Sequence, residues 1–131
     1  MKNNIWIIEF VNQKAFDEFE DLPLKIKTRL SHIIKMLEIY GNEVGEPHTA
    51  SLGEGFFEIR AKSSEGVARS IYCYQKGRKI LILATAIKKQ DKLPNSVIQI
   101  AKQRLKEYQD AKRIFLLFKA LRLTAFLSLK L

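Results

Sequence analysis

Arginine and lysine side chains recur at the ends of two apolar stretches, 55–74 and 80–94. These cations are Arg60, Lys62, Arg69, Lys88, Lys89 and Lys92. Both stretches are rich in β-branched and aromatic residues, which is typical of strands, and a strand fixes the direction of its side chains. The cations can therefore converge on one surface. Such a surface suits a polyanion, and RNA is the leading candidate.

Positive charge is concentrated in the second half of the chain. The 131 residues carry a net charge of +9, with 6 Lys/Arg and 10 Asp/Glu in residues 1–59 and 17 Lys/Arg and 4 Asp/Glu in residues 60–131. The two parts thus carry −4 and +13. This asymmetry indicates nucleic acid, an anionic membrane surface or an acidic protein as the partner, rather than charge that serves solubility alone.

Residue types limit the other chemistry that the chain can perform. Cys73 is the only cysteine and lies in an apolar strand pattern, so we expect a core residue, no disulfide and a reducing cytoplasm. No signal peptide is visible at the N-terminus. His32 falls in a predicted helix and His48 in a loop beside Pro47, without acidic or serine partners at a useful spacing. We therefore expect no metal and no cofactor, and we treat His48 as a possible substrate contact.

Hydrophobic periodicity predicts an α+β fold in the order β-α-α-β-β-β-α, with a mostly antiparallel sheet and a helical hairpin packed on one face. The predicted strands are 5–11, 56–61, 69–74 and 79–87, and the predicted helices are 14–22, 24–40 and 95–108. Residues 41–55 are rich in Gly, Asn, Glu and Pro and are predicted to be a loop. We assign 1–110 to one domain and 111–131 to a C-terminal extension.

The extension, 111–131, combines Leu, Ile and Phe side chains with five cations and no acid. The cations interrupt it too often for a clean spanning helix of about 20 apolar residues. Three interpretations stay open: packing on the domain or on a second copy of it, docking on a partner, or lying on an anionic membrane face. Of these we favour packing, including a homodimer formed through the extension, and do not expect a membrane partner.

Three motifs occur in order along the chain: Glu58-Ile59-Arg60, then 69–72 (Arg-Ser-Ile-Tyr), then 88–94 (Lys-Lys-Gln-Asp-Lys-Leu-Pro). Together with the element order, they resemble the RelE/ParE superfamily of toxins from toxin–antitoxin modules, and within it the phage-derived HigB-type branch. The resemblance covers roughly residues 5–108 and implies a small RelE-like fold. It leaves out the extension.

The resemblance implies an activity, a site and partners. Most such toxins are mRNA interferases, metal-independent endoribonucleases that act on the ribosome, and their catalytic positions match Arg60, Lys62, Arg69 and Lys88 here. Lys89 and Lys92 would contact RNA phosphates. A small helix-turn-helix antitoxin is the implied partner, beside the ribosome and mRNA. This chain has 84–86 (Ala-Thr-Ala) where many HigB-type toxins carry a histidine.

The residues themselves suit part of this chemistry. A guanidinium binds phosphate through two parallel hydrogen bonds, so Arg60 and Arg69 can hold the charge of a phosphorane-like transition state. Lys62 is a candidate base, and Arg69 or Lys88 a candidate acid. Tyr72 and Tyr74 can stack on bases, or can be half-buried sheet residues instead.

Strand alternation places Glu58, Arg60 and Lys62 on the face opposite Phe57 and Ile59, and we expect this cationic face to be open. Arg69 is in phase with the apolar Ile71 and Cys73. It therefore needs either a bulge or a place at a strand end to join the cations.

Two other functions share this fold or surface. A ParE-like toxin would poison DNA gyrase and cleave no RNA, and a decayed toxin would bind without catalysis. The cationic set on the strands favours the RNase, whereas the missing histidine and the extension favour a binding module.

Overall fold

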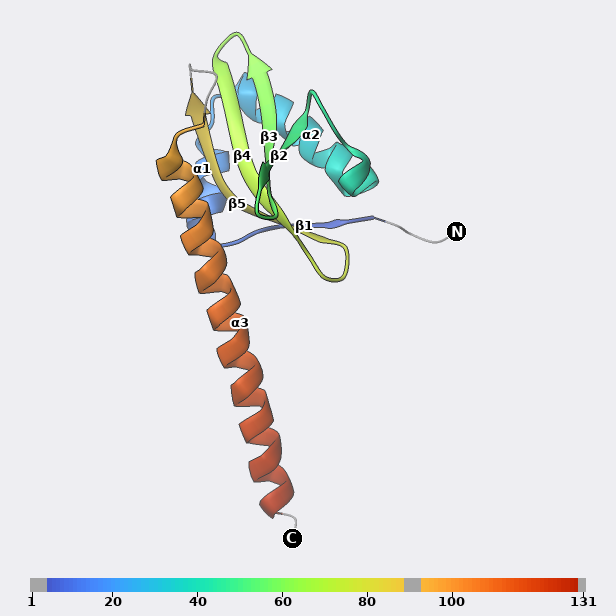
Figure 1. Ribbon diagram of the computed structural model, residues 1–131, viewed down its shortest axis with the longest axis vertical. Helices are drawn as coiled ribbons and strands as arrows, with labels where there is room; N and C mark the ends of the chain where they lie inside the picture. The colour runs from blue at the N-terminus through green and yellow to red at the C-terminus, as the bar shows by residue number, and fades with distance from the viewer. Residues whose placement is uncertain (1–4, 89–92, 130–131) are drawn as a thin grey trace.

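The computed structural model describes residues 5–88 and 93–129 and forms one sheet with helices on both of its faces (Figure 1). Its elements are β1 (Ile7–Phe10), α1 (Gln13–Glu20), α2 (Leu24–Tyr40), the 3-10 turn η1 (Gly41–Glu43), β2 (Thr49–Gly53), β3 (Phe56–Ser63), β4 (Gly66–Gln75), β5 (Lys79–Lys88) and α3 (Asn95–Leu129). The sheet order is β1-β5-β4-β3-β2. β1 pairs with β5 in parallel, and the other pairs are antiparallel.

The predicted α+β class is confirmed, including the mostly antiparallel sheet and the hairpin of α1 and α2 on one face. Residues 41–55, predicted to be a loop, contain the edge strand β2, which pairs with β3 and shifts register between Ser51 and Gly53. That strand is short and largely polar, and it can be recognised only from its hydrogen-bonded pairing with β3. The sequence of residues 41–55 alone carries no comparable signal.

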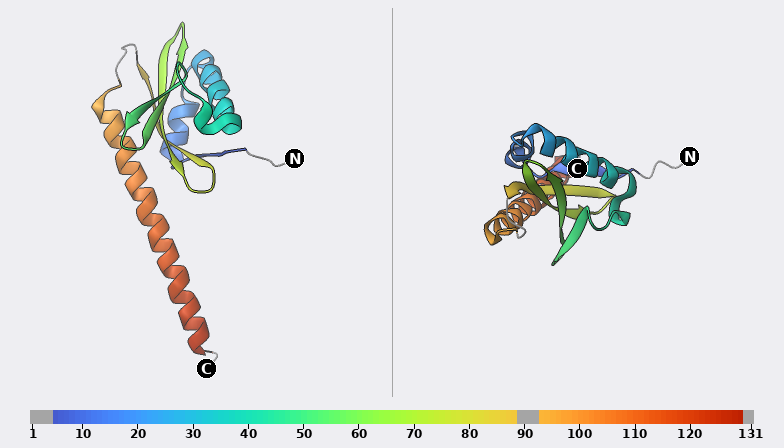
Figure 2. Two further views of the ribbon diagram at one scale, coloured as in Figure 1. Left: turned by 45° about the vertical axis from the view of Figure 1, so that its right-hand side comes forward. Right: turned by 90° about the horizontal axis from the view of Figure 1, so that it is seen from above.

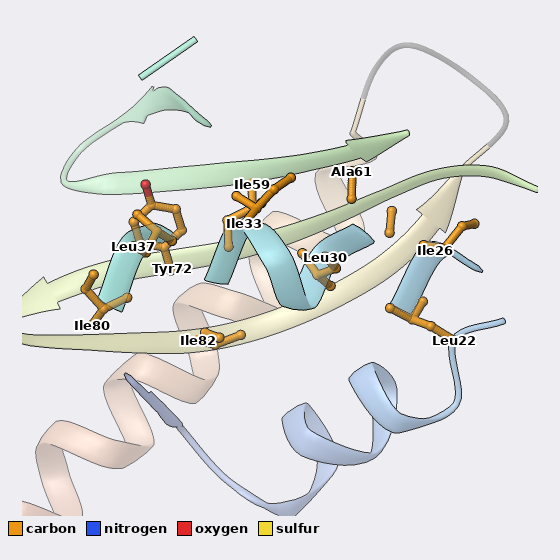
Figure 3. Close-up of a cluster of buried hydrophobic side chains, with 11 residues drawn as sticks. Leu22, Ile26, Leu30, Ile33, Leu37, Ile59, Ala61, Tyr72, Ile80 and Ile82 are labelled. Carbon is orange, nitrogen blue, oxygen red and sulfur yellow. The ribbon is translucent and has the colours of Figure 1, made fainter. Parts of the chain in front are cut away.

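The hairpin buries a core against one face of the sheet (Figure 3). Ile26, Leu30 and Leu37 of α2 are fully buried against Ile59, Tyr72 and Ile82 of the strands. Their spacing along α2 follows the helical period that predicted this helix. Gly41 ends α2 with φ +55°, and a Cβ there would overlap the Trp6 ring, so glycine is required at this position.

The other face of the sheet is covered as well, by the first half of α3 (Figure 2). The buried residues of this second core are Phe56, Ile71, Cys73, Leu81, Leu83, Ala84, Leu93 and Ala101. The expectation that the face of Glu58, Arg60 and Lys62 is open is therefore wrong over much of its area. Glu58 is buried on this face, whereas Arg60 and Lys62 stay accessible.

A bidentate ion pair holds α3 to α1. Arg104 donates from Nη1 and Nη2 to the two carboxylate oxygens of Glu18 at 2.9 and 2.7 Å. Arg104 also donates to the carbonyl of Leu83 at 2.9 Å, and Glu18 accepts from the amide of Thr85 at 3.1 Å. Because β1 pairs with β5 only as far as Ile82, these two side chains satisfy backbone groups of β5 beyond the end of β1.

Helix α3 continues well past Tyr108, where the sequence predicted its end, and reaches Leu129. Its second half leaves the domain and projects beyond the sheet (Figure 1). Large apolar side chains there, such as Phe115 and Phe118, are 60% and 66% exposed. Packing of the extension on its own domain is therefore excluded for the residues described. No helix within those residues has the length and apolarity needed to cross a membrane.

Candidate nucleic-acid interface

Arg60 of β3 and Arg69 of β4 lie side by side, and His48, directly before β2, lies next to Arg60. Arg60 and Arg69 are direct partners in the β3–β4 register. The amide of Arg60 donates to the carbonyl of His48 at 2.8 Å, which continues the β2–β3 pairing by one residue. Directly opposite residues of an antiparallel pair point to the same face. Arg69 therefore joins Arg60 without a bulge between them, and the bulge of β4 and β5 lies further along, between Ile71 and Tyr72.

Glu58 links the two arginines. Arg60 donates from Nε to Oε1 of Glu58 at 2.7 Å, and Arg69 donates from Nη1 to Oε1 and Oε2 at 3.0 and 3.2 Å. Glu58 is only 2% exposed. Its carboxylate compensates one of the two positive charges and orients both guanidinium groups. The Glu58-Ile59-Arg60 spacing predicts that Glu58 and Arg60 share one face, and the structure shows in addition that they form an ion pair.

Burial separates the roles of the cations. Arg69 is 6% exposed and is held inside the sheet by Glu58. The Arg60 side chain is 38% exposed, and Lys62 is exposed. A ligand can therefore contact Arg60 and Lys62 directly, whereas Arg69 acts through Glu58. This placement disfavours the candidate role of Arg69 as a proton donor.

A cavity of about 200 Å³ lies at the free end of this cationic row. It is lined by Arg29, Pro47, His48, Arg60 and Lys62. Three cations and a half-buried imidazole thus surround one small space, which suits an oxyanion such as a phosphate group. Arg29 comes from the exposed side of α2, and no motif or spacing in the sequence pointed to it.

Lys88 ends β5, with its Cα paired to Val67, which in turn pairs with Lys62. This register places Lys88 and Lys62 two strands apart in the same row of the sheet. The side chain of Lys88, and Lys89 and Lys92 altogether, lie outside the described residues.

The structure does not bring Tyr72 and Tyr74 to this cavity. Tyr72 is 1% exposed in the core beneath α2, stacked on Phe57 with ring centroids 5.6 Å apart. Tyr74 is half-buried and contacts Tyr72 and Trp6 edge to face. Burial raises the pKa of both hydroxyl groups. Both side chains lie on the face opposite Arg60, because they alternate with Ile71 and Cys73 along β4.

The remaining polar candidates lie apart from the cavity. His32 is exposed on α2. Cys73 is buried, and burial raises the pKa of its thiol, which disfavours the nucleophilic thiolate. Among the residues that the structure describes, no three His, Cys, Asp or Glu side chains gather as a metal site requires.

The chain is thus an α+β domain with a cavity lined by Arg, Lys and His side chains at the edge of its sheet. The family model described as "Phage derived protein Gp49-like (DUF891)" matches residues 17–106, and the chain belongs to this family. The match spans the end of α1, all of α2 and β2 to β5, and α3 as far as Lys106.

Two solved structures are similar to the chain. The toxin–antitoxin complex RelBE2 from Mycobacterium tuberculosis matches with 20% identity and a TM-score of 0.48, covering 68% of this chain and 98% of that chain. The archaeal RelE–RelB complex from Pyrococcus horikoshii matches with 18% identity and a TM-score of 0.48, covering 67% and 99%. A search of the curated proteins by sequence finds no match.

Proposed function

We propose that the protein is a HigB-type toxin of a type II toxin–antitoxin module that cleaves messenger RNA on the ribosome without a metal. The observation that carries this proposal is the convergence of Arg29, His48, Arg60 and Lys62 on one cavity of about 200 Å³. The three ordered motifs and membership of a phage-derived family support it. In this proposal, residues 1–110 are the toxin domain and 111–131 an extension.

Cleavage requires the 2′-hydroxyl to lose a proton and attack the adjacent phosphorus. The bond from O2′ to phosphorus forms, the bond from phosphorus to O5′ breaks, and the leaving oxygen takes up a proton. The products are a 2′,3′-cyclic phosphate and a 5′-hydroxyl. Arg60 and Lys62 stabilise the charge that develops on the non-bridging oxygens, because their side chains reach the cavity.

Among the described residues, His48 is the best-placed group for proton transfer. Its imidazole lines the cavity with Arg60 and Lys62, and an imidazole can both accept and donate a proton near neutral pH. His48, directly before β2, supplies the imidazole that residues 84–86 of β5 lack. Lys62 then serves as a phosphate contact rather than the base, and Lys88 stays a proposed acid.

Glu58 and Arg69 act as positioning residues. Glu58 accepts hydrogen bonds from both arginines, so the Arg60 guanidinium is oriented before a ligand arrives. A preorganised donor gains more from a developing charge than a mobile one, because it needs no reorientation during the reaction.

The proposal includes a partner. A small helix-turn-helix antitoxin encoded beside the toxin would neutralise it, and the ribosome would present the mRNA in the cytoplasm. Both similar structures are described as complexes of a toxin with its antitoxin. The gene next to that of this chain identifies the candidate antitoxin.

Regulated expression tests the function. We expect growth arrest with fragmented mRNA and unchanged plasmid supercoiling, and rescue by the neighbouring gene product. Growth arrest with intact RNA and altered supercoiling would instead indicate a gyrase poison. Normal growth would indicate a binding module without toxin activity.

A further inference from the structure

The second half of α3 is an apolar surface that its own domain leaves uncovered. In the first half, Val97, Ile98, Ala101 and Leu105 pack on the sheet. Beyond Arg113 the large apolar side chains are all 54–66% exposed wherever the structure describes them. They are Ile114, Phe115, Leu116, Leu117, Phe118, Leu121, Leu123 and Leu127. So much exposed apolar area on one helix marks an interaction surface.

Charge on this segment has a single sign. Residues 111–131 contain five Lys or Arg and no Asp or Glu. Among the described residues, Arg113 lies 3.7 Å from Asp110, whereas Lys119 and Arg122 pair with no carboxylate. Lys119 lies over the Phe115 ring of its own helix instead, 5.4 Å from the centroid. These cations are therefore available to an anionic surface.

One side of this half of the helix carries apolar residues without cations, and Lys112 and Lys119 lie on the opposite side. Ile114, Leu117, Phe118 and Leu121 follow the i, i+3, i+4, i+7 spacing that forms one face of a helix with about 3.6 residues per turn. Lys112 and Lys119 are seven residues apart and lie on the opposite side. Arg122 lies at the boundary between the two sides.

We propose that this half of α3 lies in the surface of an anionic lipid bilayer. Ile114, Leu117, Phe118 and Leu121 enter the acyl region, while Lys112, Lys119 and Arg122 reach the lipid phosphates. The aliphatic stems of Lys and Arg can lie along apolar surroundings while their charges stay at the headgroups, so these stems also cover Leu116 and Leu123, which lie beside the cations on the same side of the helix. This inference does not rest on the RNase activity, and it reverses the expectation of no membrane partner.

Charge complementarity favours the bilayer over a second copy. Two copies of this helix would bring only like charges together, because no acid follows Asp110. A bilayer surface offers phosphates to the cationic side of the helix and acyl chains to its apolar side, and it needs no matched pattern of side chains. The segment 111–129 is about 28 Å long at 1.5 Å per residue, which gives a long line of contact in the plane of the membrane.

Vesicle sedimentation with the full chain, freed of RNA, tests the proposal. We expect binding to vesicles of equal phosphatidylcholine and phosphatidylglycerol, and binding at least about tenfold weaker to phosphatidylcholine alone, because the cations need anionic headgroups. Added salt should weaken the binding. No binding to the anionic vesicles, or equal binding to both kinds, would overturn the proposal.

Matched variants assign the binding to the helix. Leu117→Asp/Leu121→Asp should abolish it, and Lys119→Gln/Arg122→Gln should weaken it on the order of twentyfold. Leu24→Asp, at a side chain 75% exposed on α2, and Lys14→Gln/Lys25→Gln, at two exposed lysines, should leave it unchanged. If the control variants lost as much vesicle binding as the helix variants, the vesicles would be attracted to the basic domain as a whole, which would contradict the proposal.

The oligomeric state without lipid provides an independent measurement. Analytical ultracentrifugation should show a monomer. A dimer that Leu117→Asp/Leu121→Asp dissociates would identify a second copy as the occupant and overturn the proposal.

Discussion

Arg69 of β4 donates hydrogen bonds to both carboxylate oxygens of Glu58 on β3, at 3.0 and 3.2 Å. Both residues are nearly inaccessible, at 6% and 2% exposure. The same carboxylate accepts from Arg60, whose side chain reaches the edge cavity. The buried Glu58–Arg69 pair is therefore connected to Arg60, which a ligand can contact.

Loss of the Glu58 charge should destabilise the fold. Glu58→Gln removes the carboxylate charge that accepts from both Arg60 and Arg69, and breaking a buried ion pair from one side costs about 3 kcal/mol or more. We expect a fall of that size in the free energy of unfolding, measured by urea denaturation. Arg60→Gln, at a side chain 38% exposed, should lower it by about 1 kcal/mol or less. Equal effects of the two variants would show that the buried pair has no special role.

Replacing Arg104 should loosen α3 from the domain. The Arg104 side chain is 11% exposed, and it holds both Glu18 and the carbonyl of Leu83. We expect Arg104→Met to lower the free energy of unfolding by about 2 kcal/mol, since three hydrogen bonds to a mostly buried cation are lost. Hydrogen exchange should rise in the first half of α3. Lys102→Met breaks a largely exposed pair with Glu54 and serves as the matched control, with little change expected.

The sequence predicted the elements whose side chains repeat with a clear period. The apolar spacing of α2 and the alternation in β3 to β5 are local signals, and these elements form as expected. Strand β2 and the pairing of Glu18 with Arg104 depend on residues far apart in the chain. Alternation also misled, because it assumes one buried face, whereas the second face packs against α3 and also holds the buried Glu58 and Arg69.

Alkaline pH should destabilise the protein through Tyr72 and Cys73. Burial raises the pKa of Tyr72 above its ordinary 10.0 and that of Cys73 above 9.0. As the pH rises past these ordinary values, the unfolded chain loses protons that the folded chain keeps. Stability is therefore complete below about pH 9 and falls above it.

Denaturation at about pH 8 and about pH 10.5 measures this loss. Tyr72→Phe should make it smaller, because the phenol no longer titrates. Tyr40→Phe, at an exposed tyrosine on α2, is the matched control and should leave the pH dependence as it is. A stability that does not change between these pH values would contradict the assignment.

Substitution of His48 should separate catalysis from binding. We expect His48→Asn to slow cleavage about a hundredfold, a typical effect of losing a general acid or base, while affinity for a non-cleavable 2′-O-methyl RNA changes little. Arg29→Gln should show the opposite pattern, with weaker RNA binding and a salt dependence reduced by about one phosphate contact. Equal losses of affinity and rate in the two variants would contradict these roles.

The candidate site was partly predictable for a similar reason. Arg60, Lys62 and Arg69 stand in or beside local motifs, so the sequence alone makes them candidates. The entry of Arg29 from α2 and the position of His48 beside Arg60 arise only when the helix and the edge strand pack together. No spacing in the sequence reports such a meeting of distant segments.

Primer extension on a translated mRNA tests the central claim most directly. The account predicts that the wild-type protein produces discrete cuts that a Lys14→Gln/Lys25→Gln control also produces. In the Arg60→Gln/Lys62→Gln variant, the cuts should weaken about a hundredfold, because the donors to the transition-state charge are gone. Identical cleavage patterns for the wild type and this variant, or no cuts by the wild type, would contradict it.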